Sequence, residues 1–90
     1  MTEANTTASK WAPTIPAETY AALRREYPGV LRLPRVVALC GVQKSTIWKW
    51  AKSGKFPAPV RLSANATGWR EADVRAWVHG LETVSEEGAA

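Results

Sequence analysis

Residues 31–57 decide the fold of this chain and read LRLPRVVALCGVQKSTIWKWAKSGKFP. Pro34 is tolerated in a first helical turn, and Gly41 is typical of the residue that follows a helix C-terminus, so these two residues bound a short helix. A second helix follows over roughly residues 44–53 and is closed by Gly54. Two short helices joined by a turn of about three or four residues containing glycine are the pattern of a helix-turn-helix.

The first of these helices carries an apolar face and the single cysteine of the chain. We expect Val36, Val37, Leu39 and Cys40 to be its buried residues. Free cysteine is among the most often buried residue types, which favours a core position for Cys40 as well. One cysteine excludes an internal disulfide. The one histidine, His79, lies far from it in sequence, and two such residues cannot complete a four-ligand zinc site. The sequence therefore predicts no metal site and no cofactor.

The second helix has two different sides when its residues are placed at about 100° per residue. The apolar residues cluster on one side, namely Ile47, Trp50 and Ala51. The rest of its surface presents polar side chains and one ring, namely Ser45, Thr46, Trp48, Lys49 and Lys52. Lysine, hydroxyl groups and an apolar ring can contact base edges in the major groove of DNA. A solvated amphipathic helix would show the same periodicity, although a large exposed ring usually has a partner.

A β-hairpin is expected after the second helix. Residues 56–59 (FPAP) cannot be helical because they hold two prolines. Residues 60–62 and 67–70 alternate in the manner of strands and can pair around a tip of small residues. We expect Trp69 in the core. The side chains of this wing that would lie near a phosphate backbone are Arg61, Asn65 and Arg70.

Two further helices flank this region. The first begins at Pro16 and places Tyr20, Leu23 and Tyr27 on one face, which we expect to dock on the rest of the domain, with an oligomer contact as the alternative. The last helix runs from Glu71 to about Leu81, and acids in its first turn complement the helix dipole. Its expected core residues are Val74, Trp77, Val78 and Leu81.

The charged residues are segregated along the 90-residue chain, whose formal net charge is +4. Residues 27–70 contain no aspartate or glutamate. They hold eight basic residues, namely Arg32, Arg35, Lys44, Lys49, Lys52, Lys55, Arg61 and Arg70. A surface of one sign inside a foldable segment favours a polyanion as partner, and the alternative is an ordinary set of solubilising charges.

Other classes of protein are disfavoured. The longest apolar run, residues 36–42, is far shorter than the about 20 residues that cross a membrane, and no signal peptide is visible, so we expect a cytoplasmic protein. The sequence has no cluster of catalytic acids, no phosphate-binding glycine loop and no set of metal ligands. We therefore expect no enzyme activity.

The stretch from Leu31 to about Leu81 resembles the AlpA family of short phage and prophage regulators, which also includes many excisionases. The pieces that carry the resemblance are LRLP at 31–34, GVQKSTIW at 41–48, GKFP at 54–57 and GWRE at 68–71, followed by Val74 and Trp77. Their order and spacing are more specific than any single piece. Position 43 is Gln, where the family usually has Ser or Thr. Because Gln caps poorly, we expect the second helix to begin one residue later, capped by Ser45.

This resemblance implies a mainly α fold with a small β-hairpin, a winged helix-turn-helix related to the DNA-binding domain of MerR regulators. Three core helices and a short N-terminal helix would compose it. The resemblance covers the expected winged helix-turn-helix at 30–82. From composition and periodicity we expect a disordered tail at 1–15, an accessory helix at 16–28 and a C-terminal tail at 83–90; the tail and the helix before Pro28 lie outside the family pattern, and their role is open.

The resemblance also implies that the second helix reads the major groove and that the hairpin lies along the DNA backbone or minor groove. The reading residues would be Lys44, Ser45, Thr46, Trp48, Lys49 and Lys52. The resemblance places Arg61 and the hairpin tip at the wing. We expect the contacts of the wing and the DNA backbone to come from Arg61, Asn65, Arg70, Arg35 and Lys55.

We expect the protein to bind double-stranded DNA sequence-specifically. Its expected role is that of a phage or prophage excisionase, which bends attachment-site DNA and assists an integrase. Copies would associate cooperatively on tandem sites. The alternative is a transcriptional regulator at a promoter. A contrasting alternative is a protein–protein adaptor that uses Trp48 and the face of Tyr20 and Tyr27 as a hydrophobic hot spot.

Overall fold

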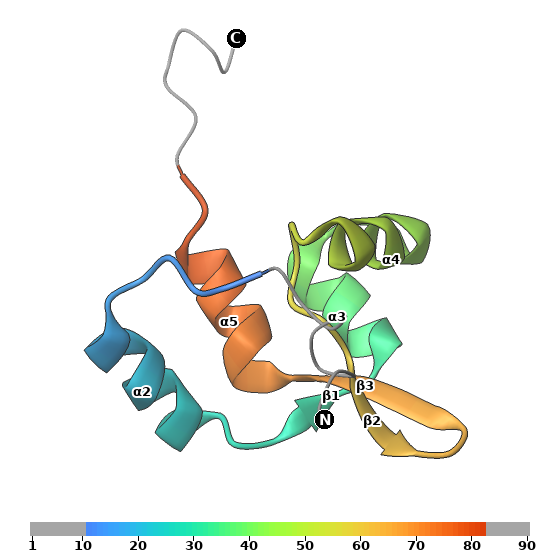
Figure 1. The fold of residues 1–90 in the computed structure, drawn as a ribbon, viewed down its shortest axis with the longest axis horizontal. Helices are drawn as coiled ribbons and strands as arrows, with labels where there is room; N and C mark the ends of the chain where they lie inside the picture. The colour runs from blue at the N-terminus through green and yellow to red at the C-terminus, as the bar shows by residue number, and fades with distance from the viewer. Residues whose placement is uncertain (1–10, 83–90) are drawn as a thin grey trace, which may run out of the picture.

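Four helices and a three-stranded antiparallel sheet make up residues 11–82, the part of the chain that the computed structural model describes (Figure 1). The helices are α2 (Ala17–Glu26), α3 (Leu33–Cys40), α4 (Lys44–Ser53) and α5 (Glu71–His79). The strands are β1 (Val30–Leu31), β2 (Val60–Ser63) and β3 (Ala66–Arg70). Residues 1–10 of the tail predicted over 1–15, and the whole of the tail predicted over 83–90, lie outside the described residues.

The two central helices begin and end close to their predicted bounds. Gly41 (φ 75°) and Gly54 (φ 86°) follow α3 and α4 in the left-handed conformation that glycine adopts at little cost. The predicted capping of α4 by Ser45 is wrong. Its helix begins at Lys44, and the Gln43 carbonyl accepts the N–H groups of Thr46 and Ile47 at 3.0 and 3.1 Å without any side-chain cap.

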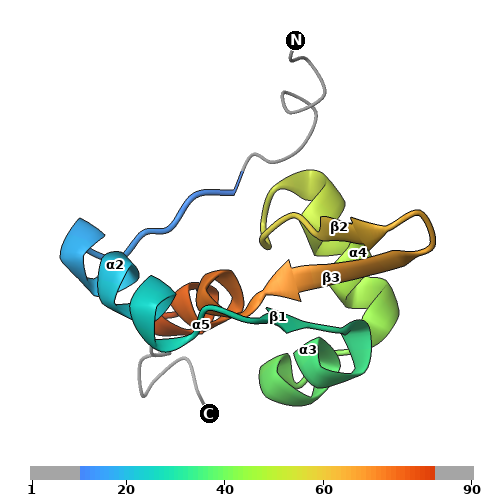
Figure 2. The same cartoon turned by 90° about the horizontal axis from the view of Figure 1, so that it is seen from below.

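The hairpin forms as predicted, and the sheet gains a third strand. Figure 2 shows the strands side by side in the order β1-β3-β2. Val60 pairs with Gly68 and Arg61 with Thr67 in the hairpin, and a register shift precedes Ser63. The third strand is β1, which pairs with β3 through Leu31 and Trp69. Strand β3 is therefore the central strand of the sheet.

Trp69 lies at the centre of the main core. It is fully buried and is packed with Leu31, Val36, Ile47, Ala51, Phe56 and Val74. Its indole Nε1–H donates to the Pro57 carbonyl at 2.8 Å, and Trp77 donates in the same way to the Lys55 carbonyl at 2.9 Å. Two tryptophans thus fix the segment that connects α4 to the hairpin.

A second, smaller cluster joins α2 to α5. Leu23, Ala72 and Ala76 are its buried residues, and Tyr20 and Tyr27 pack against it, which confirms the predicted docking face of α2. Trp11 and Ile15 also pack here. The part of the predicted tail that the structure describes, residues 11–15, is therefore in contact with the folded domain.

Several expected core positions are wrong. Leu39, Val78 and Leu81 are exposed, whereas Cys40 is half-buried and packs against the main core as expected. For Val78 the reason is that α5 lies between the two clusters, so the buried residues of this helix are Val74 on one side and Ala72 and Ala76 on the other. The helix also ends at His79, before Leu81 is reached.

Candidate nucleic-acid interface

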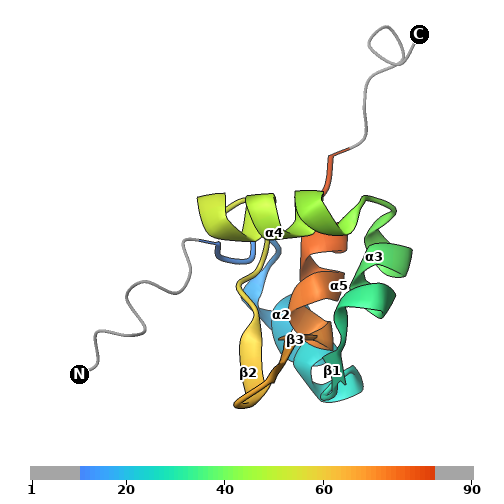
Figure 3. The same ribbon diagram turned by 90° about the vertical axis from the view of Figure 1, so that its right-hand side faces the viewer.

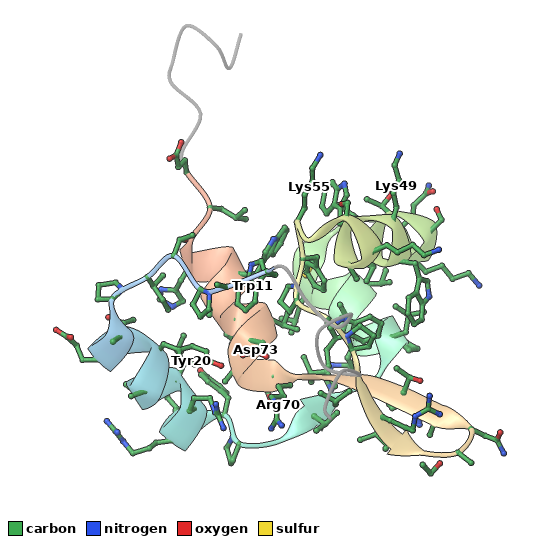
Figure 4. All side chains as sticks on the ribbon, viewed as in Figure 1. Trp11, Tyr20, Lys49, Lys55, Arg70 and Asp73 are labelled. Carbon is green, nitrogen blue, oxygen red and sulfur yellow. The ribbon has the colours of Figure 1, made fainter. Side chains whose placement is uncertain are left out.

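Helix α4 presents a basic and hydroxylic surface to solvent. Ile47 and Ala51 are buried, so the opposite side of the helix is fixed outward. Lys44, Ser45, Lys49 and Lys52 are exposed, and Thr46 is half-buried. Figure 4 shows Lys49 pointing away from the body of the domain. The arrangement can offer ammonium and hydroxyl donors to a polar partner along about one face of the helix.

Trp48 lies on the side of α4 that faces the sheet. It is 44% exposed, and its ring centroid is 5.2 Å from that of Trp69 with an angle of 59° between the planes. The ring therefore covers Trp69 and forms an apolar surface between the outward face of α4 and the hairpin. Its packing partner within the domain gives Trp48 a structural role in addition to any external contact.

The hairpin projects beside α4. Figure 3 shows α4 across the top of the molecule, the hairpin on one side below it and α3 on the other. Arg61 is exposed, and its Nη1 donates to the Ala64 carbonyl at 3.5 Å. The backbone N–H of Asn65 donates to Ser63 Oγ at 3.4 Å. The Asn65 residue is exposed at the tip of the hairpin.

The predicted site residues are not all on one surface. Lys55 points to the same side of the molecule as Lys49, whereas Arg70 lies at the base of the hairpin and points to the other side (Figure 4). Arg35 is exposed in the first turn of α3. The structure thus groups the α4 residues with Lys55 and separates them from Arg70.

The acidic residues lie outside this surface, and the two in the first turn of α5 have partners within the domain. Glu71 Oε2 accepts two hydrogen bonds from Arg75, the shorter at 2.8 Å. Asp73 accepts a hydrogen bond from the Tyr20 hydroxyl. None of the described residues from 27 to 70 is acidic, so the surface of α4 and the hairpin carries positive charge without internal compensation.

Sequence reasoning gave no role to Arg32, which the structure ties to the hairpin. The Arg32 Nε–H donates to the Thr67 carbonyl at 3.1 Å, and the side chain is exposed. The residue belongs to the basic segment, but its contact depends on how β1 ends beside β3. Only the sheet register could have predicted it.

The adaptor hypothesis loses its proposed hot spot. Tyr20 and Tyr27 pack between α2 and α5, and the Arg75 guanidinium lies 4.2 Å from the centre of the Tyr27 ring. Trp48 lies against Trp69 in the other cluster. The three rings therefore do not form one exposed surface.

We also looked at residues 11–82 for a metal site, a reactive thiol and a membrane-spanning helix. Residues 11–82 hold no group of three His, Cys, Asp or Glu side chains placed to bind a metal ion. Burial raises the pKa of the Cys40 thiol to about 11, which keeps it protonated at neutral pH. No helix within these residues has the length and apolar character needed to cross a membrane.

Comparisons with known proteins place the chain in a family. The family model described as prophage CP4-57 regulatory protein (AlpA) matches residues 29–82, more than half of the chain. Uncharacterized protein ORF88 of Enterobacteria phage P4 is 40% identical over 50 residues, which are 56% of this chain and 57% of that protein. The chain thus spans a little over half of this relative, and no solved structure matches. The match begins at the first strand and includes α3, α4, the hairpin and α5; the chain belongs to the AlpA family of phage regulatory proteins.

Proposed function

We propose that this protein binds double-stranded DNA sequence-specifically and that α3, α4 and the hairpin act as a winged helix-turn-helix. The observation that carries the proposal is the outward face of α4, where Ser45, Lys49 and Lys52 are exposed opposite the buried Ile47 and Ala51. A helix of this kind fits the major groove, in which lysine and hydroxyl groups reach base edges.

The hairpin supplies the second contact of the proposed complex. Arg61 and Asn65 are exposed on it, and hydrogen bonds within the tip, such as that of Arg61 to Ala64, restrain its shape. Backbone contacts of this type set the register of a protein on DNA without reading sequence. Lys55 and Arg35 would add phosphate contacts near the two ends of the helix pair, whereas Arg70 would take part only if the DNA bends toward the base of the hairpin.

Within this function, we propose a role in prophage excision, in which the protein bends attachment-site DNA and assists an integrase. Neighbouring copies would bind tandem sites cooperatively. The second candidate is control of transcription at a promoter, and the description of the matched family as a regulatory protein favours it. Both roles use the same DNA-binding surface.

The proposal is tested by fluorescence anisotropy of the full chain on short duplexes tiled across the DNA that flanks its own gene. We expect one tile to bind tightly in the presence of competitor DNA, with an affinity that falls steeply as salt increases. Weak binding of equal strength to every tile would contradict sequence-specific recognition.

The position of the bound tile separates the two roles. A site next to an attachment sequence, with bending in a circular-permutation assay and stimulation of excision by the integrase, would support excision. A site that overlaps a promoter, with no effect on recombination, would support transcriptional control. Duplexes with one or two copies of the site measure the expected cooperativity.

A further inference from the structure

Arg32 occupies the place where β1 leaves the sheet. β1 pairs with β3 through Val30 with Arg70 and Leu31 with Trp69. The chain then turns into α3, and Arg32 is the residue before the first helical turn. Thr67, two residues closer to the hairpin tip than Trp69, consequently has no strand beside it on this edge. The Nε–H of Arg32 donates to the Thr67 carbonyl at 3.1 Å in place of a strand N–H.

Thr67 is paired with Arg61 on its other side. The side chains of Arg32 and Arg61 both contact the carbonyl groups of the hairpin. Each donates one N–H group to a hairpin carbonyl, at Thr67 and at Ala64 respectively. Since a guanidinium has five donors in a fixed plane, most donors of both side chains stay available.

The surroundings of Arg32 leave its charge without an internal counterion. It is exposed, and no carboxylate of residues 11–82 forms an ion pair with it. The hydrogen bond to Thr67 restrains a long side chain that would otherwise be free, which lowers the entropic cost of a further contact. A restrained, exposed guanidinium with free N–H groups suits an oxyanion with several acceptor oxygens.

We propose that Arg32 positions the hairpin against α3 and binds a phosphate of the DNA backbone through its Nη groups. This inference rests on the proposed DNA binding and adds one residue and one contact to it. The Thr67 carbonyl fixes the guanidinium beside the hairpin, and the phosphate would lie between α3 and the wing. In this proposal one side chain both orients the hairpin and contacts a phosphate of the DNA.

The experiment compares three variants of the full chain on the best-binding duplex and on an unrelated duplex. Arg32→Gln removes the charge, Arg32→Lys keeps it without the donor fork, and Arg25→Gln removes a charge from α2, on the side of the domain away from the hairpin. Binding is measured as the slope of log affinity against log salt concentration. Each phosphate contact contributes about 0.9 to this slope on duplex DNA.

We expect Arg32→Gln to lower the steepness of the slope by about 0.9 on both duplexes, while Arg25→Gln leaves it at the wild-type value. Arg32→Lys should keep most of the slope and bind several-fold more weakly. A purely structural arginine would change the thermal midpoint and not the slope. Equal slopes for Arg32→Gln and Arg25→Gln would overturn the phosphate contact.

Two further outcomes are decided by the same data. If Arg32→Gln is unfolded at the assay temperature, the lysine variant decides, because wild-type affinity in Arg32→Lys would overturn the proposal. If the wild-type protein itself shows no salt-dependent binding to any duplex, the proposed DNA-binding function fails, and the inference on Arg32 fails with it. Wild-type binding together with unchanged variants removes only the inference.

Discussion

The side of the domain formed by α4 and the hairpin differs from the side formed by α2 and α5 in how each holds its charges. Asp73 of α5 accepts a hydrogen bond from Tyr20 of α2, and Arg75 of α5 lies over the ring of Tyr27, which follows α2. Glu71 pairs with Arg75 within α5. No lysine of α4 forms an ion pair within residues 11–82. On one side Asp73 and Arg75 help to join two helices, whereas on the other the lysines of α4 stay available to an external partner.

The same two sides rest on different clusters of buried residues. Trp69 and Phe56 support α4 and the hairpin, and Leu23 with Ala72 and Ala76 supports α2. Helix α5 contributes to both clusters. The comparison therefore predicts that changes in the first cluster affect stability and DNA binding together, while changes in the second affect stability alone.

The largest effect is expected for Trp69→Ala. Removing a fully buried indole leaves a cavity beneath Trp48 and beside Phe56, and such truncations cost about 3–5 kcal/mol of unfolding free energy. This loss is a large part of the unfolding free energy of a small domain, which is about 5–15 kcal/mol. Urea unfolding followed by circular dichroism measures the loss.

Trp69→Phe is the matched control. It keeps a ring in the core but removes the donor to the Pro57 carbonyl, so a smaller loss of about 1–3 kcal/mol is expected. If the alanine variant unfolds at the same urea concentration as the wild type, Trp69 does not support the α4–hairpin side.

Leu23→Ala tests the second cluster. Leu23 is buried against Ala72 and Ala76, and we expect a loss of about 2–5 kcal/mol with unchanged DNA affinity of the folded fraction. Leu81→Ala makes the same chemical change at a position that is 55% exposed and should cost about 0.5 kcal/mol or less. A loss of DNA affinity in folded Leu23→Ala would show that the two sides are coupled.

The sequence predicts the helix pair and the hairpin well because their signals are local. Gly41 and Gly54 follow α3 and α4 with positive φ, a role that glycine signals from the local sequence. The alternation of apolar and polar residues around 60–70 indicates strands without reference to other parts of the chain. The outward face of α4 follows from the periodicity of Ile47 and Ala51. These features need no knowledge of distant parts of the chain.

The errors arise where distant segments meet. The burial of Ala72 and Ala76 in place of Val78 depends on α2 packing against α5, which periodicity within α5 does not reveal. The contact of Trp48 with Trp69 and that of Arg32 with Thr67 both depend on the sheet register. Sequence reasoning therefore finds the residue types of the candidate interface and misses the contacts that orient them.

Lys49→Ala should weaken binding to the specific duplex by about 1–3 kcal/mol, if Lys49 reaches a base edge, with little change in unfolding free energy. Lys49 is exposed and has no hydrogen bond or ion pair within the described residues, so its removal leaves no buried group without a partner. Arg25→Ala on α2 controls for net charge. Equal weakening on specific and unrelated duplexes would instead assign Lys49 to a phosphate.

The smallest effect is expected for Tyr20→Phe, which removes the hydroxyl that donates to Asp73. The variant should lose about 1 kcal/mol of unfolding free energy and no DNA affinity, because this bond belongs to the α2–α5 side. Tyr27→Phe is the matched control, since the Tyr27 hydroxyl has no hydrogen-bond partner within residues 11–82.

The pH dependence of this difference gives a sharper test. Burial, together with the hydrogen bond to Asp73, raises the pKa of Tyr20 above its ordinary value of 10.0. The folded state then holds the phenolic proton more tightly than the unfolded state, so the contribution is complete below about pH 10 and is lost as the pH rises through the folded pKa. The difference in stability between wild type and Tyr20→Phe should shrink above pH 10, because the variant has no proton to lose at this position. A difference that stays constant between neutral pH and pH 11 would mean that the Tyr20–Asp73 bond does not join α2 to α5, which would leave the contact of Arg75 with the Tyr27 ring as the charged contact between them.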